Sequence, residues 1–208
     1  MKTLDERYLS YLNSGNSFGK VQVNTFLSLL GNSYNRILEV GCGKGFFSYL
    51  LLKEKKIKHK KMFGVDVFDS CQKDELETLS NKFKFKKIES GGDLPFPPNY
   101  FDLVFSHGVL EHFTDKEIVT LLNMQLKISK ILIFSVPSNY LSNKDRYFGN
   151  ERFLSMGKWE GIINNTEGEV IETFGFHYLI GWRGYWDTFI RGKILGPSPY
   201  FVFVLQKK

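Results

Sequence analysis

Cysteine is scarce in this chain, which has only Cys42 and Cys71 among its 208 residues. Two thiols cannot supply the disulfide framework on which small secreted domains depend, and such sparing use is typical of a reducing compartment. The segment Met1–Ser10 is charged at positions 5 to 7, where a secretory signal peptide would be apolar. We therefore expect a cytoplasmic protein.

Long apolar runs are also missing. No stretch approaches the ~20 apolar residues that a membrane-spanning helix needs. There is no internal repeat, no low-complexity tract and no linker long enough to separate two domains. These absences predict a single domain over residues 1–208 with no membrane span, and a hydrophobic content of 42% is enough to give it a sizeable core.

The charge balance is basic, with a net charge of +6 and a pI of about 9.1. Much of the excess comes from Lys53–Lys61, which contains six lysines. A solvated loop is the ordinary explanation for such a run, and a nucleic-acid contact is the alternative. Salt-dependent RNA binding would separate the two.

The chain is organised around the segment Arg36–Gly45. It begins with a short apolar strand that contains Glu39, and it continues with glycine at positions 41, 43 and 45. Phe46, Phe47, Leu50 and Leu51 then follow at helical spacing. The order is therefore strand, glycine turn and helix. Glycines let the backbone turn sharply and let a ligand approach it, and the helix points its free N–H groups the same way.

Three interpretations of this turn are open. A dinucleotide fingerprint would place its third glycine at position 46, but Phe46 stands there and would crowd a pyrophosphate. A plain strand-to-helix turn needs no ligand. The spacing Glu39-x-Gly41-x-Gly43-x-Gly45 resembles the first motif of the class I S-adenosylmethionine (SAM) methyltransferases. The resemblance implies that this turn, with Cys42 inside it, passes under the methionine part of SAM, and that Glu39 lies near its charged end.

A second acidic residue follows at the spacing of a ribose site. Met62–Asp66 is typical of a buried strand, and Asp66 comes 21 residues after Gly45. Nucleotide sites often place a carboxylate about this far along to accept hydrogen bonds from ribose hydroxyls. A structural cap at the strand end is the alternative. We predict that Asp66 and the adjacent Val67 belong to the SAM site.

The segment from Leu94 to Val104 has the most specific pattern. Its Leu-Pro-Phe-Pro…Phe-Asp-Leu-Val sequence is similar to the small-molecule methyltransferase branch that includes ubiquinone-type and sterol-type enzymes. In that branch an acid four residues before the leucine holds the adenine amine. Ser90 occupies that position here. The resemblance therefore implies Ser90 and the Gly91 backbone as first candidates for reading adenine, and Asp93, next to Leu94, as the second.

The segment Ser106–Phe113 matches the Val-Leu-Glu-His signature of the same branch. Ligands of open parallel sheets bind beyond the carboxyl ends of the strands, so Ser106 and His107 should lie beside the sulfonium. His107 and His112 are candidate general bases because histidine titrates near neutrality; a purely structural role is the alternative for each. The spacing H-x-x-x-E-H matches no zinc-peptidase pattern, and we expect no metal.

Residues 138–190 are rich in aromatic side chains interleaved with arginine. Plain core packing is one explanation. The other is a set of acceptor-side insertions that roof a pocket for a small, partly apolar molecule, in which the candidate substrate residues are Tyr147, Arg152, Trp159 and Trp182.

The hydrophobic periodicity predicts the order of the elements. Two helices, over 4–12 and 21–30, precede the first strand and form either a lid or simple packing on the sheet edge. Further helices are expected over 69–82, 114–129 and 155–165. Further strands are expected over 62–66, 83–88, 101–105, 130–136, 169–174 and 200–205.

The resemblance covers residues 34–137 well and the last strand, over 199–206, loosely. It implies an α/β, Rossmann-like fold with a seven-stranded, mostly parallel sheet, helices on both faces and an antiparallel last strand. Residues 1–33 would hold the lid helices. SAM would be the methyl donor and a small molecule the acceptor. The alternatives are an RNA or protein methyltransferase, or a non-catalytic protein that binds SAM. The sequence leaves the acceptor and the oligomeric state open.

Overall fold

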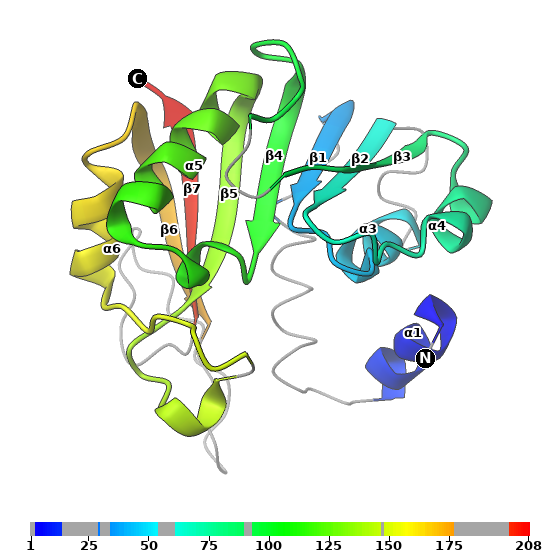
Figure 1. Cartoon of the computed structure of the whole chain (residues 1–208), viewed down its shortest axis with the longest axis horizontal. Coiled ribbons are helices and arrows are strands. Elements are labelled where there is room, and N and C mark those ends of the chain that lie inside the picture. Colours follow the sequence, from blue (N-terminus) through cyan, green and yellow to red (C-terminus); the bar gives the residue numbers. More distant parts are fainter. Residues whose placement is uncertain are drawn as a thin grey trace.

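In the computed structural model, residues 3–13, 29, 34–53, 61–89, 93–146, 148–176 and 200–208 are described. Seven strands form one sheet in the order β3-β2-β1-β4-β5-β7-β6 (Figure 1). Their bounds are β1 Arg36–Val40, β2 Lys61–Asp66, β3 Phe83–Lys87, β4 Phe101–His107, β5 Ser129–Pro137, β6 Gly168–Phe176 and β7 Tyr200–Lys207.

The strand directions agree with the predicted fold class. The pairs from β3 across to β5 are all parallel. Only β7 is reversed, since it pairs antiparallel with both β5 and β6. The carboxyl ends of β1, β2 and β4 therefore meet at one edge of the sheet (Figure 1).

Helices cover both faces of the sheet (Figure 1). One face carries α1 Leu4–Asn13, α3 Phe46–Lys53 and α4 Lys73–Leu79, and the other carries α5 Asp115–Ile128 and α6 Met156–Ile163. Two short 3-10 turns, η1 Leu110–His112 and η2 Asn143–Asp145, complete the described elements.

Each face of the sheet has its own apolar core, because successive side chains of a strand point to opposite faces. In β1, Ile37 packs into the core under α3 and α4, while Leu38 packs into the core under α5 and α6. Both side chains are fully buried. A strand buried on both faces reads as a continuous apolar run, which is why β1 and β4 are recognisable in the sequence.

Capping residues set several helix ends. Thr114 caps α5 with a complete capping box to Glu117, and Thr3 forms the same reciprocal pair with Glu6 ahead of α1. Ser155 accepts a hydrogen bond from the Lys158 N–H at the start of α6.

The predicted helix over 69–82 was placed too widely, because α4 spans only Lys73–Leu79. At its start, the Asp66 carboxylate accepts the Phe68 N–H and keeps the chain in a turn. At its end, the Phe83 N–H bonds to the Ser80 carbonyl, so the chain is already turning into β3.

The first of the two predicted N-terminal helices packs against the helices α3 and α4. Leu4 of α1 is fully buried, and its N–H donates to Glu75 of α4 at 2.9 Å. Asp5 bonds to Tyr49 and Lys53 of α3. These contacts fit the packing alternative for α1. The second predicted helix, over 21–30, lies outside the described residues except for Leu29.

Trp159 is a core residue, and its prediction as a wall of the acceptor pocket is wrong. It lies on α6, is fully buried, and packs against Phe134 of β5 and Phe203 of β7 at ring-centroid distances of 6.0 and 6.5 Å. The local sequence could not separate the two roles, since Trp159 meets these partners only through the tertiary fold. Within the described residues, no helix has the length and apolar character needed to cross a membrane.

We predict that Trp159→Ala lowers the free energy of unfolding by about 3–5 kcal/mol, because it leaves a large cavity between α6 and the sheet. Denaturant unfolding measures the loss. Phe148→Ala is the matched control, because that ring is 73% exposed and its removal should cost under about 1 kcal/mol. Equal losses in the two variants would contradict the assignment of Trp159 to the core.

Candidate active site

The turn between β1 and α3 has three glycines in the left-handed region, with φ of +72° at Gly41, +53° at Gly43 and +85° at Gly45. Side chains rarely adopt this backbone conformation, so the sequence pattern follows from the geometry. The turn is tied to β2 by hydrogen bonds from the Gly41 and Cys42 N–H groups to the Val65 carbonyl, at 2.9 and 3.1 Å.

The surroundings of these glycines differ. A Cβ at Gly41 would lie 2.3 Å from Val109 Cγ2, and one at Gly45 would lie 2.6 Å from Leu76 Cδ1. Packing therefore requires glycine at both positions. A Cβ at Gly43 would meet no atom within 4 Å. The space in front of Gly43 is open, which is what a backbone that receives a ligand needs.

Asp66 stands at the end of β2 and faces this turn. Its Oδ2 accepts the Gly43 N–H at 2.7 Å, and its Oδ1 accepts the Phe68 N–H at 2.9 Å. The residue is 7% exposed. The carboxylate thus lies beside the open glycine, and it lines a pocket at the carboxyl ends of the strands.

Glu39 is held against α3. It is buried, and its Oε2 accepts hydrogen bonds from both the backbone N–H and the hydroxyl of Ser48. Burial raises the pKa of Glu39 to about 8, although the Ser48 hydrogen bonds oppose that rise. The carboxyl group therefore fastens the first turn of α3 to the end of β1. Its contact with the charged end of SAM stays a prediction.

The pocket has a volume of about 650 Å³ including its mouth. Its walls come from the ends of β1 and β2, from the segments that follow β3 and β4, and from the inner face of α5. The lining residues are Val40, Gly41, Asp66, Val67, Ile88, Glu89, Leu94, Val109, Phe113, Leu121, Met124 and Gln125.

Four predicted cofactor residues, Gly41, Asp66, Val67 and Leu94, line this pocket together. Asp93 is exposed beside Leu94 and is not part of the wall. Four further predicted residues, Ser90, Gly91, Tyr147 and Trp182, lie outside the described residues.

Cys42 is buried behind the turn. Its sulfur lies 2.9 Å from the position that a Cβ on Gly64 would take, so it fills the space over β2. A hydrogen bond with the Cys71 thiol, together with burial, raises the pKa of Cys42. The thiol is therefore protonated at neutral pH and is a poor nucleophile.

His107 ends β4 between two aromatic rings. Its imidazole lies 4.6 Å from the Phe47 ring centroid and 6.2 Å from that of Tyr200. Burial lowers the pKa of His107 to about 4, so the ring is neutral at pH 7. Ser106, the residue before it, is buried at 1% exposure.

The segment 148–152 packs onto η1, directly beyond β4. The Arg152 N–H donates to the Glu111 carbonyl at 2.9 Å, and His112 Nδ1 lies 2.8 Å from Asn150 Oδ1. Phe148 meets the His112 ring edge to face at 5.6 Å. Part of the predicted acceptor-side insertion thus lies beside His112, one of the two predicted catalytic residues.

Arg152, a candidate substrate residue, is engaged within the protein. Its Nη1 donates to the Phe113 carbonyl at 2.6 Å, and its Nη2 pairs with Asp115 Oδ1 at 2.5 Å. Lys158 also pairs with Asp115, at 2.8 Å. The guanidinium therefore fastens the segment 148–152 to the start of α5.

A family model described as a methyltransferase domain matches residues 32–177. The chain belongs to this methyltransferase family. The match agrees with the predicted class, the SAM-dependent methyltransferases, and with the predicted cofactor. The match does not distinguish the ubiquinone-type and sterol-type branch from other branches of the family. Among curated proteins, none matches the chain significantly.

Several solved structures share the fold of this methyltransferase domain. The methyltransferase domain of bacterial CtHen1 has a TM-score of 0.67 at 18% identity, covering 91% of this chain and 100% of that one. A SAM-dependent methyltransferase from Aquifex aeolicus has a TM-score of 0.67 at 14% identity, with full coverage of both chains. Magnesium protoporphyrin IX methyltransferase from Synechocystis PCC 6803, with bound SAH, has a TM-score of 0.64 at 15% identity, covering 98% and 94%.

The pocket also receives side chains from α5, which the sequence pattern indicated only as a helix. Leu121, Met124 and Gln125 of α5 line the pocket. A signal was present, because Ile118, Leu122, Gln125 and Leu126 form the buried stripe of α5 and Gln125 is its single polar member. A polar residue within an apolar stripe is the informative exception.

Glu111 provides a pH test of this site. It is 4% exposed, and burial, with the Glu151 carboxylate nearby, raises its pKa to about 8. Because the folded protein holds the proton more tightly than the unfolded chain, the stability from this group is complete below the unfolded pKa of about 4.5 and is lost as the pH rises through about 8.

We predict that Glu111→Gln, which mimics the protonated form, reduces the pH dependence of the unfolding free energy. The reduction corresponds to the uptake of one proton at most. The unfolding free energy of the wild type should fall more steeply, by about 1.4 kcal/mol per pH unit at most, between about pH 6.5 and 7.5. Denaturant unfolding at several pH values measures the slope. Near pH 5 the two proteins should be about equally stable, which is the internal control. Parallel slopes would contradict the raised pKa.

Proposed function

We propose that this methyltransferase domain binds SAM with its methionine part over Gly43 and its adenosine in the pocket beyond Asp66, and that it methylates a small molecule. The observation that carries the proposal is the open space in front of Gly43, next to a carboxylate at the end of the neighbouring strand. The residues fit the group, because the turn leaves room for a ligand and the pocket walls are mainly apolar.

When bound, SAM supplies a methyl group on a sulfonium, which passes to an acceptor lone pair by direct displacement. The chain's own contribution is to hold the reacting groups in line and to exclude water. Phe47, His107 and Tyr200 form an aromatic cluster at the end of β4 that suits this task. A neutral His107 adds no positive charge beside a sulfonium.

His112 fits a proton acceptor better than His107 does. Asn150 Oδ1 can only accept, so the 2.8 Å contact assigns the hydrogen of the His112 ring to Nδ1. Nε2 then holds the lone pair that could take a proton from an acceptor hydroxyl or amine. With its low pKa, His107 is a weak base and suits a contact role.

Two observations favour a small acceptor over a nucleic acid. Beside His112 lies the exposed ring of Phe148, which can contact an apolar molecule. The lysine-rich segment begins at Lys53, the last residue of α3, and ends at Lys61, the first residue of β2. The pocket lies at the other end of β2, beside Asp66. Among similar structures, the Synechocystis enzyme is named for a porphyrin acceptor.

We predict that Gly43→Ala weakens SAM binding at least about ten-fold, because its Cβ would enter the ligand's place. Isothermal titration calorimetry measures the affinity. Gly149→Ala is the matched control: Gly149 also has positive φ, at +87°, and a Cβ added there would likewise meet no atom within 4 Å. Both variants should lose similar stability, of about 1 kcal/mol. Wild-type SAM affinity in folded Gly43→Ala would overturn the proposal.

We predict that Asp66→Ala weakens SAM binding by about 1.5–3 kcal/mol, the usual range for hydrogen bonds to a charged group. Asp66→Asn, which keeps one acceptor oxygen, should lose less. Thermal unfolding of both variants must be recorded, since Asp66 also accepts the Gly43 N–H. If both variants fold and bind SAM as the wild type does, Asp66 does not hold the ribose.

A further inference from the structure

We propose that Gln125 of α5 reads the adenine ring of SAM through its side-chain amide. The inference rests on the proposed function and names the group that recognises the base. The branch that this sequence resembles uses an acid four residues before the leucine, but this chain has Ser90 at that position. Ser90 and Gly91 lie outside the described residues, and α5 supplies a further polar group on the pocket wall.

The burial of Gln125 is unusual for its residue type. It is 1% exposed, within the apolar stripe of α5 that packs on the sheet. Its Oε1 has no hydrogen-bond partner within the described part of the chain. A buried acceptor without a partner costs free energy, and such a group is commonly explained by a ligand or an ordered water.

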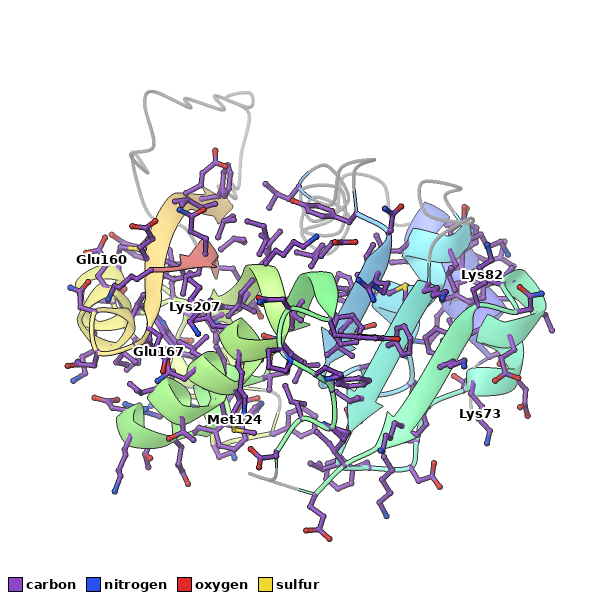
Figure 2. The ribbon with its side chains drawn as sticks, turned by 90° about the horizontal axis from the view of Figure 1, so that it is seen from above. Lys73, Lys82, Met124, Glu160, Glu167 and Lys207 are labelled. Carbon is purple, nitrogen blue, oxygen red and sulfur yellow. The ribbon has the colours of Figure 1, made fainter. Side chains whose placement is uncertain are left out.

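The place of Gln125 in the pocket fits an adenine reader. Gly41 and Asp66 line the pocket at the ends of β1 and β2, where the ribose is proposed to lie, and Gln125 lines it from α5. Its neighbour Met124 is labelled in Figure 2 on the same helix, and lines the pocket together with Ile88 and Leu94 from beyond β3. A flat purine between these walls would present one edge to α5.

The chemistry of the two groups is complementary. The adenine 6-amino group donates a hydrogen bond, and the adjacent ring nitrogens accept one. A glutamine amide both accepts and donates, which is the pairing by which Gln and Asn recognise adenine in other settings. Removal of the 6-amino group would leave Oε1 again without a partner.

Glu89 is the competing reader on the same pocket. It follows β3 and lines the pocket, but it is exposed. Water can solvate its carboxylate whether or not a ligand is bound, so a hydrogen bond from adenine gains less there. Glu89→Gln is therefore the matched control for a change at Gln125.

The test compares two ligands by calorimetry, SAH and the analogue in which hydrogen replaces the adenine 6-amino group. The wild type should prefer SAH by about five- to ten-fold, the scale of one buried hydrogen bond. Gln125→Met, which keeps the shape of the side chain, should bring this ratio close to one by weakening SAH more than the analogue. Glu89→Gln should leave the ratio unchanged.

The outcomes separate the two proposals. If the wild type binds neither ligand, the proposed function fails. If it binds SAH and the preference persists in Gln125→Met, or disappears in Glu89→Gln, the inference about Gln125 is overturned. Should Gln125→Met not fold, the side-chain amide resonances of Gln125 in the wild type serve instead. They should shift with SAH and much less with the analogue, and equal shifts would overturn the inference.

Discussion

The glycine turn is held against the end of β2 by three backbone N–H donors, and the site depends on this junction. Gly41 and Cys42 donate to the Val65 carbonyl, and Gly43 donates to the Asp66 carboxylate. These bonds bring the turn and the acid together, although they are 23 residues apart. Because Gly43 has no Cβ and one added there would meet no atom within 4 Å, a ligand can approach the backbone at that position. The same bonds orient the start of α3.

Much of this arrangement could be predicted from the sequence, because it follows from local rules. Glycine at alternate positions favours a tight turn, and the apolar run before it favours a buried strand. An acid at the end of the next strand is typical of a ribose site. The capping pairs at Thr3 and Thr114 are local as well. Parallel strands buried on both faces read as apolar runs, so the strands were also predictable, whereas the reversed last strand was implied by the resemblance to the methyltransferases.

The acceptor side could not be predicted in the same way, because side-chain roles there depend on tertiary partners. Trp159 and Arg152 have the residue types of a binding pocket, yet one packs on Phe134 and Phe203 and the other pairs with Asp115. Neither partner is signalled by spacing. Gln125 is the opposite case: its residue type suggests a surface, and only its position in the buried stripe of α5 reveals it. Burial therefore decides between the roles that residue type leaves open.

Burial also controls charge at this edge of the sheet, and this follows from the cost of an unpaired ion in an apolar setting. Glu39 and Glu111, both with raised pKa, keep their protons at neutral pH, while His107 stays uncharged because burial lowers its pKa. The polar groups left along the pocket are Asp66, which accepts two backbone N–H groups, the exposed Glu89, and the amide of Gln125 on α5. A ligand with a polar ribose and a flat apolar base is matched by this order of groups. The distribution of charge thus orients a ligand, with the apolar walls supplying the contact area.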